Sequence, residues 1–474
     1  MSRKRKEQPI VQNVRIENIA AEGMAIAHLD DGMVVFVPFA APGDVADIKL
    51  LKRKKRHAQG VIVRMEREAD EEIRTEPRCE HFGTCGGCKW QHLTYPLQLR
   101  CKQQQVVDAM KHLGGLEDIP VEPIIGADPI YAYRNKLEYT FSNRKWIPFE
   151  KMGTAEADDN RDGAGFHISG AFDKVLDINR CHLQDDISNR IRLFVKDYGK
   201  RNNLTFFDLR EQTGLLRTMM VRSASTGQIM VVMVFGESQT EQIHRLLDAV
   251  RKQFPEITSL LYTVNTKAND TISDLDILTH SGQPYIEEQM EGRLKFRIGP
   301  KSFYQTNSIQ AERLYSTVRE FASLTGNELV YDLYTGTGTI AQFIARDARR
   351  VIGIEYVPEA IEDAKINAGV NGLDDKTTFI AGDMKDVLTD NFIAENGLPD
   401  VMVVDPPRAG MHPDVVETIL RAQPRRIVYV SCNPATQARD IAHLSNFYKL
   451  ERMRPVDMFP HTAHVENVAL LTLM

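Results

Sequence analysis

The C-terminal part of the chain alternates short apolar runs with longer segments of mixed polarity. Apolar runs of this length are typical of buried parallel strands, and the intervening segments have the length of helices. The runs that we interpret as strands cover residues 329–333, 350–355, 378–383, 400–405 and 426–430. Strands that alternate with helices predict a doubly wound parallel sheet. Two further runs, residues 448–458 and 465–474, predict a hairpin at one edge of this sheet.

The first 66 residues follow a different pattern, in which the runs are shorter and apolar residues alternate with polar ones. We expect strands at residues 14–17, 24–28, 33–37 and 45–48, separated by turns that contain glycine. Short strands at close spacing predict a small barrel of the oligonucleotide-binding type.

The charge of the chain is unevenly distributed. Residues 1–64 contain 12 Lys or Arg and 7 Asp or Glu, whereas the whole chain has a formal net charge of −6. Two basic runs, residues 3–6 and 52–56, account for most of the positive charge. A basic run can be simply a solvated surface, but positive charge gathered on a barrel favours contact with nucleic-acid phosphates.

The turn after the first predicted C-terminal strand contains two glycines, Gly336 and Gly338, and the next strand ends on Glu355. Glycine lets the backbone approach a ligand, and an acid at this place can accept both ribose hydroxyls of a nucleoside. The third glycine of the dinucleotide-binding pattern is missing. The turn therefore favours a ligand without phosphates, such as S-adenosylmethionine, over NAD.

Cys432 directly follows the last predicted parallel strand and is succeeded by Asn433 and Pro434. A free cysteine is often just a small buried apolar residue. At the carboxyl end of a sheet strand, however, a cysteine held by an Asn-Pro turn is placed for chemistry in the crevice of the sheet.

Three motifs together give the chain a resemblance to a known family. Asp405-Pro-Pro-Arg408, Ser431-Cys-Asn-Pro434 and His464-Val-Glu-Asn467 are similar to motifs of the RNA uracil-C5-methyltransferases. Over nearly its whole length the chain most resembles the branch that acts on 23S ribosomal RNA, with an N-terminal TRAM domain and an iron–sulfur cluster. Arg408 stands where adenine methyltransferases have an aromatic residue and RNA cytosine-C5 enzymes have the nucleophilic cysteine.

Methylation at C5 of uracil requires a nucleophile and a base. A thiolate that adds to C6 makes C5 resemble an enolate, and a base must then remove the C5 proton so that the cysteine can leave. Cys432 supplies the nucleophile, and Glu466 is our candidate for the base. Asp405 would hold the substrate or the methyl donor, and Arg408 would orient the base or the cysteine loop. The target base has to leave its stack to be reached.

The resemblance also implies the residues that hold S-adenosyl-L-methionine. They are Gln305, Tyr334, Thr339, Glu355, Asp383 and Asp405. Gln305 matches the phenylalanine-x-glutamine-x-asparagine stretch of the family, and Thr339 stands where relatives often have asparagine.

Five of the six cysteines lie outside this region, and Cys79, Cys85 and Cys88 fall within ten residues. Such crowding suits zinc or an iron–sulfur cluster. Disulfides are less favoured, because no export signal is evident and cytosolic thiols stay reduced. By spacing alone, either Cys101 or Cys181 could be the fourth ligand. The family pattern implies that Cys181 is the fourth ligand and that the ligands hold a [4Fe-4S] cluster. Cys101 would then be a core residue of a helical segment.

We therefore expect a multidomain α/β protein: a TRAM-like barrel over residues 1–68, a central α/β domain with the cluster over 69–295, and a Rossmann-like methyltransferase domain over 296–474. Residues 92–122 should be helical and pack on the C-terminal domain. No apolar stretch is long enough to span a membrane. We expect a cytoplasmic monomer.

The substrate expected from this resemblance is RNA, most specifically 23S ribosomal RNA. Two alternatives stay open. The first is the same chemistry on transfer RNA. The barrel and the cysteine cluster argue against it, because transfer-RNA relatives usually lack both. The second is a non-catalytic RNA-binding or ribosome-assembly protein, against which Cys432, Glu466 and the glycine turn argue.

Overall fold

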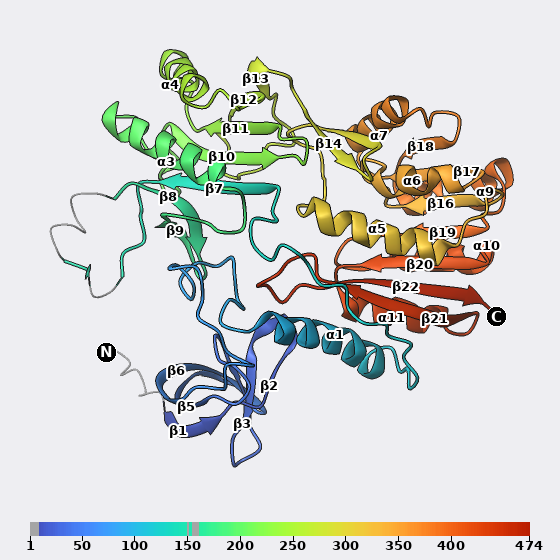
Figure 1. Ribbon diagram of the computed structural model, residues 1–474, viewed down its shortest axis with the longest axis horizontal. Helices are drawn as coiled ribbons and strands as arrows, with labels where there is room; N and C mark the ends of the chain where they lie inside the picture. The colour runs from blue at the N-terminus through green and yellow to red at the C-terminus, as the bar shows by residue number, and fades with distance from the viewer. Residues whose placement is uncertain (1–8, 149–150, 154–160) are drawn as a thin grey trace.

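The computed structural model describes residues 9–148, 151–153 and 161–474, so the basic run at residues 3–6 lies outside the described residues. Figure 1 shows a small barrel at the N-terminus, a central sheet with two helices, and a C-terminal sheet flanked by helices. The long helix α1 (Tyr95–His112) runs between the barrel and the C-terminal sheet. No helix among the described residues is long and apolar enough to cross a membrane.

The barrel is a six-stranded sheet in the order β1-β5-β6-β4-β3-β2. Its strands are β1 (Ile10–Arg15), β2 (Asn18–Ile19), β3 (Ala25–His28), β4 (Val34–Val37), β5 (Val45–Arg53) and β6 (His57–Arg67). Alternate residues such as Val35, Val37 and Ile48 are fully buried in its core, as a half-buried strand requires. The basic run at residues 52–56 spans the exposed end of β5 and the turn into β6.

The central domain is built on a seven-stranded sheet in the order β13-β12-β11-β10-β7-β8-β9. Its elements are β7 (Lys136–Ser142), β8 (Gly163–Ile168), β9 (Ala171–Asp177), α3 (Asp186–Arg201), β10 (Leu216–Ser223), β11 (Ile229–Phe235), α4 (Thr240–Gln253), β12 (Ser259–Val264) and β13 (Leu278–Gly282). Met219 and Val221 pack in a core with α3 and α4. Met220, between them, belongs to a core shared with the C-terminal domain, so the two faces of this sheet join two different cores.

The C-terminal sheet has the order β18-β17-β16-β19-β20-β22-β21. Its strands are β16 (Leu329–Leu333), β17 (Arg350–Glu355), β18 (Thr377–Ala381), β19 (Val401–Val404), β20 (Arg426–Ser431), β21 (Tyr448–Val456) and β22 (Glu466–Leu473). The strands from β16 to β20 are parallel, and β22 pairs antiparallel with both β20 and β21. The predicted parallel sheet and its edge hairpin are confirmed.

Helices cover both faces of this sheet. On one face lie α5 (Ser308–Ala322), α6 (Thr339–Ile344) and α7 (Pro358–Asn371). On the other lie α1, α8 (Met384–Val387), α9 (Asp390–Asn396), α10 (Pro413–Ala422) and α11 (Pro434–Leu444). A two-stranded ribbon of β14 (Ile286–Met290) and β15 (Leu294–Ile298) precedes α5. Along β16, Val330 faces the first layer, whereas Leu329, Tyr331 and Leu333 face the second.

Helix α1 belongs by packing to the C-terminal domain, although it lies early in the sequence. Val106 and Met110 are fully buried in the core with α10 and α11. The ammonium of Lys102 forms an ion pair with Asp457, at 2.5 Å from Oδ1, and both side chains are completely buried. Tyr95 donates its hydroxyl proton to Oδ2 of Asp457 at 2.9 Å. These polar contacts fix α1 to the loop that connects β21 and β22.

Replacing Lys102 by methionine tests this attachment. The change leaves a buried carboxylate without its cation, so we expect the free energy of unfolding to fall by about 3 kcal/mol. Equilibrium urea unfolding measures the loss, and Lys111→Met at the exposed end of the same helix is the matched control. Equal stability of the two variants would show that the pair does not hold the helix.

Candidate active site

Cys432 lies where the chain leaves β20 and turns into α11. Asn433 caps the helix, because its side-chain oxygen accepts a hydrogen bond from the amide of Ala435 at 3.1 Å. Its side-chain amide donates to the carbonyl of Arg408 at 3.0 Å. The Asn-Pro turn is therefore hydrogen-bonded to the Pro-Pro-Arg loop that follows β19, and this contact fixes the backbone that carries the thiol.

Strand pairing brings Glu466 beside Cys432. Ser431, the last residue of β20, is paired with Asn467 of β22. Cys432 directly follows Ser431, and Glu466 directly precedes Asn467, so the two residues lie at the adjoining ends of the paired strands. The negative charge of Glu466 also acts on the thiol, raising its pKa. The structure thus places the two predicted catalytic residues next to each other.

Glu466 is a buried carboxyl group with 7% of its surface exposed. Burial, and then the nearby charge of Asp405, raise its pKa to about 8, and the charge of Arg408 opposes them. A carboxyl group with a pKa near neutrality can exchange protons at the pH of the cell. This carboxyl is suited to the role of a base.

The thiol of Cys432 experiences opposing influences. Burial raises its pKa, as do the charges of Glu466 and Asp405, whereas a hydrogen bond and the charge of Arg408 lower it. Arg408 donates from Nη2 to Nδ1 of His464 at 2.8 Å. Burial and the guanidinium lower the pKa of His464 to about 4, which keeps the imidazole neutral and able to accept this bond. Arg408 is thereby oriented as the cation of the site.

Asp405 directly follows β19, and its amide donates to the carbonyl of Leu333 in the neighbouring strand at 3.3 Å. Burial, and then the charge of Asp332, raise the pKa of Asp405 to about 7. Asp332 itself is 1% exposed, and burial raises its pKa to about 7 as well. Its Oδ1 has no hydrogen-bond partner among the described residues. Asp332 is not among the site residues predicted from the sequence, although an acid inside the apolar run 329–333 is a visible signal.

The glycine turn after β16 shapes the other side of the crevice. Tyr334 has φ +63°, a left-handed conformation that is uncommon outside glycine and that clusters at functional sites. The amides of Gly336 and Val357 donate to the two carboxylate oxygens of Glu355, at 3.1 and 3.0 Å. A side chain added at Gly336 would meet no atom within 4 Å, so this turn faces open space.

The remaining predicted donor-binding residues are spread around this turn. Asp383 follows β18 and caps α8, accepting from the amide of Lys385 at 3.2 Å. Gln305 lies just before α5, where its carbonyl accepts from the side chain of Asn135 at 2.8 Å. Thr339 begins α6 with only 9% of its surface exposed, and its hydroxyl lies 3.2 Å from that of Tyr315. The hydroxyl of Thr339 is therefore engaged within the protein.

The four predicted cluster ligands line one cavity of about 510 Å³. Cys79, Cys85 and Cys88 come from the segment before α1, and Cys181 comes from the loop before α3. Among the described residues, no three His, Cys, Asp or Glu side chains are arranged to hold a metal ion. Cys101 does not line this cavity; it packs beside Trp90 and Leu97.

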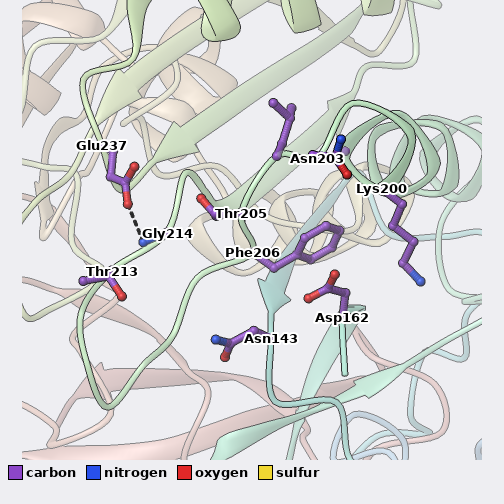
Figure 2. Close-up of a pocket in the computed structure, with 11 residues that line it drawn as sticks. Asn143, Asp162, Lys200, Asn203, Thr205, Phe206, Thr213, Gly214 and Glu237 are labelled. Atoms are coloured by element: carbon purple, nitrogen blue, oxygen red, sulfur yellow. Dashed lines mark hydrogen bonds between the residues drawn. The ribbon is translucent and has the colours of Figure 1, made fainter. Parts of the chain in front are cut away.

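A second cavity of about 770 Å³ lies in the central domain (Figure 2). Lys200 and Asn203 come from the end of α3 and just beyond it, and Thr205, Thr213 and Glu237 come from segments flanking β10 and β11. Glu237 accepts a hydrogen bond from the amide of Gly214. None of the residues that line this cavity is a predicted catalytic, donor-binding or cluster residue.

Comparison with known proteins agrees with this geometry. A family described as tRNA (Uracil-5-)-methyltransferase matches residues 220–474, and the TRAM domain matches residues 6–63. A protein of Porphyromonas gingivalis named as an uncharacterized RNA methyltransferase is 57% identical over 465 residues, covering 97% of this chain and 99% of that protein. One of Chlorobaculum tepidum is 38% identical, covering 96% of this chain and 94% of its own.

Among solved structures, the chain is similar to the tRNA (uracil-54, C5)-methyltransferase of Pyrococcus abyssi in complex with S-adenosyl-L-homocysteine. The TM-score is 0.73 at 28% identity, covering 98% of this chain and 100% of that one. Because this transfer-RNA enzyme matches the chain over its full length, barrel included, the barrel does not argue against a transfer-RNA substrate.

The sheet and its crevice define a methyltransferase that depends on S-adenosyl-L-methionine. More narrowly, the chain belongs to the tRNA (uracil-5-)-methyltransferase family and carries an N-terminal TRAM domain. It is an RNA methyltransferase, so the alternative of a non-catalytic RNA-binding protein is set aside.

The raised pKa of Glu466 predicts a pH-dependent stability. A carboxyl group with a pKa of 4.5 when unfolded and about 8 when folded stabilises the protein fully below pH 4.5, and this contribution is lost as the pH rises toward 8. Glu466→Gln has no carboxyl group to ionise, so its stability does not fall for this reason as the pH rises. The variant should therefore gain stability relative to the parent between pH 5 and 8.5, by on the order of 4 kcal/mol at the upper end.

Urea unfolding at several pH values measures this gain, with Glu417→Gln on the exposed surface of α10 as the control. The same pH profile in the Glu466 variant and the parent would show that the carboxyl is not buried as described.

Proposed function

We propose that this enzyme forms 5-methyluridine in RNA through a covalent adduct between Cys432 and C6 of the target uracil. The observation that carries the proposal is the placement of a thiol opposite a buried carboxyl at the paired ends of β20 and β22. Family membership supplies the reaction class, and this pair of side chains supplies the two groups that the chemistry at C5 requires.

In the proposed reaction, the sulfur of Cys432 bonds to C6, and the electron pair of the C5–C6 double bond moves to C5. The reaction begins with Cys432 as a thiolate, after its proton has passed to water, and with Glu466 ionised. The charge of Arg408 favours the thiolate against the burial that raises the thiol pKa. S-adenosyl-L-methionine, when bound, supplies the electrophilic methyl group that C5 takes. Glu466 then accepts the proton of C5, the C5–C6 double bond forms again, and Cys432 leaves as a thiolate. Glu466 finishes protonated, which its raised pKa favours.

The donor would lie against the turn after β16. We assign its ribose to Glu355, whose carboxylate is held in place by two backbone amides. Tyr334, Asp383 and Asp405 follow the carboxyl ends of β16, β18 and β19, around the same crevice. Gln305 approaches from the loop before α5. Thr339, whose hydroxyl is engaged with Tyr315, would contribute through its backbone at the start of α6.

We propose 23S ribosomal RNA as the substrate, on the resemblance of the cysteine motif to that branch of the family. Transfer RNA is the second candidate, and the full-length similarity to the Pyrococcus abyssi enzyme favours it. All of the proposed catalytic residues come from one chain, so the proposal is a monomer that acts on RNA in the cytoplasm. Mapping 5-methyluridine in ribosomal and transfer RNA from cells with and without the gene distinguishes the two substrates.

Two substitutions separate the roles of the catalytic pair. Cys432→Ala should reduce methylation of RNA to background, because no adduct can form, while binding of S-adenosyl-L-homocysteine persists. Glu466→Gln should still form the adduct but release it about 10²–10⁴ times more slowly. Gel analysis of protein-bound RNA together with methyl-transfer assays measures both. Normal turnover by either variant would remove that residue from its role.

The cysteine cavity supports a second proposal, that it holds a [4Fe-4S] cluster bound by Cys79, Cys85, Cys88 and Cys181. Cysteines from two segments line one cavity of about 510 Å³, far more room than a single zinc ion takes. When bound, the cluster would link the segment before α1 to the loop before α3. We assign it a structural role.

Iron and acid-labile sulfide in anaerobically purified protein test the cluster. We expect about four irons per chain in the parent, in keeping with a cluster of this type, and their loss in Cys88→Ser. Cys101→Ser, which alters a thiol outside the cavity, should keep its iron. One zinc per chain in place of iron would contradict the assignment.

A further inference from the structure

The loop between β21 and β22 leads directly into Glu466 and is held from several sides. At its start, Asp457 pairs with Lys102 of α1. Near its end, Nδ1 of His464 accepts the hydrogen bond from Arg408. The loop over residues 457–465 therefore lies between the catalytic groups and elements from the N-terminal part of the chain.

The middle of this loop is fixed by backbone contacts to the segment before α1. The carbonyl of His461 accepts from the amides of Lys89 and Trp90, at 2.9 and 3.0 Å. Its own amide donates to Oε1 of Gln98 at 2.8 Å, and its ring stacks on Tyr131 with the ring centres 4.3 Å apart. His461 has φ +65°, a conformation that persists in a non-glycine residue only when its surroundings hold it.

The barrel reaches the same loop through Gly23, in the turn before β3. The indole nitrogen of the fully buried Trp90 donates to the carbonyl of Gly23 at 2.9 Å. A Cβ added at Gly23 would lie 2.8 Å from Cβ of Ala463 and 3.0 Å from the indole nitrogen. The barrel thus touches the loop three residues before Glu466, at a contact with no room for a side chain.

We propose that the TRAM barrel acts as a positioning element for catalysis, and that its turn at Gly23 sets the course of the loop that carries His464 and Glu466. The inference rests on the proposed function, because it concerns the residues assigned as the base and as the support of Arg408. It gives the barrel a task that is separate from binding RNA.

A group that presses on Cβ of Ala463 would displace the backbone of the loop. This Cβ is bonded to the backbone, so a group pushed against it cannot be accommodated by a rotamer change and moves the chain instead. The neighbouring His464 accepts a hydrogen bond from Arg408, whose charge acts on the thiol of Cys432 and lowers its pKa. A movement of the loop therefore displaces the base and the cation together. Misplacement of a catalytic group by about 1 Å can lower the rate about 10²-fold.

Gly23→Ala, compared with Gly32→Ala, tests the proposal in the full-length enzyme. Both glycines lie in turns of the barrel with similar positive φ, +84° and +78°, but a Cβ at Gly32 meets no atom within 4 Å. Gly23→Ala should lower kcat for RNA methylation about tenfold or more, with little change in KM for RNA. It should also speed hydrogen exchange in the loop peptide 457–465. Gly32→Ala should change neither.

Ala463→Gly provides a rescue. Adding it to Gly23→Ala removes the atom at 2.8 Å and should restore most of kcat relative to Ala463→Gly alone. Three results would overturn the proposal: an effect of Gly23→Ala on KM alone, equal losses in both glycine variants, or no rescue. If the proposed function is wrong, Glu466→Gln turns over normally. Hydrogen exchange in the loop then still shows whether the barrel positions it.

Discussion

The insertion of β22 between β20 and β21 is the constraint on which the site depends. The strand runs antiparallel to β20, so the end of β20 meets the beginning of β22, and Cys432 and Glu466 adjoin the last pair, Ser431 with Asn467. A shift of one residue in this register would turn Glu466 to the other face of the sheet. Val468 and Leu470 pack in one core, whereas Ala469 and Leu471 pack in the other. The packing of β22 therefore fixes the position of Glu466 relative to Cys432, the two residues proposed to be catalytic.

Burial of several carboxyl groups around one guanidinium sets the electrostatic character of the crevice. Burial raises the pKa of Asp332, Asp405 and Glu466; the charge of Asp332 adds to the shift of Asp405, and that of Asp405 to the shift of Glu466. Arg408 opposes this effect at both the thiol and Glu466. Its own orientation is fixed by a neutral histidine. Arg408 thus favours the ionised forms of the thiol and of Glu466, against the burial that raises both pKa values.

The sequence was sufficient to predict the C-terminal sheet, since its strands are continuous apolar runs. Several of these runs are ended or followed by a residue of the candidate site, such as Glu355, Asp405 or Cys432. It was less informative for the barrel: β6 was not among the expected strands, because polar residues interrupt its apolar pattern. The cysteine spacing left the fourth ligand open, and the structure brings Cys181, and not Cys101, to the shared cavity.

Long-range contacts had no local signal. Gly23 meets Ala463, and Lys102 meets Asp457, across hundreds of residues of sequence. A glycine in a turn predicts only a positive φ, and a lysine in a helix usually lies at the surface. The partnership of His464 with Arg408 likewise depends on how two loops meet. Such contacts follow from the tertiary arrangement alone.

The most direct test of the catalytic assignment is to trap the enzyme on RNA that contains 5-fluorouridine and to map the cross-linked peptide by mass spectrometry. Fluorine at C5 cannot be removed as a proton, so the adduct should persist with the methyl group already transferred. The account predicts a single modified peptide whose RNA is attached at Cys432. Attachment at another cysteine, or methyl transfer without any covalent adduct, would contradict it.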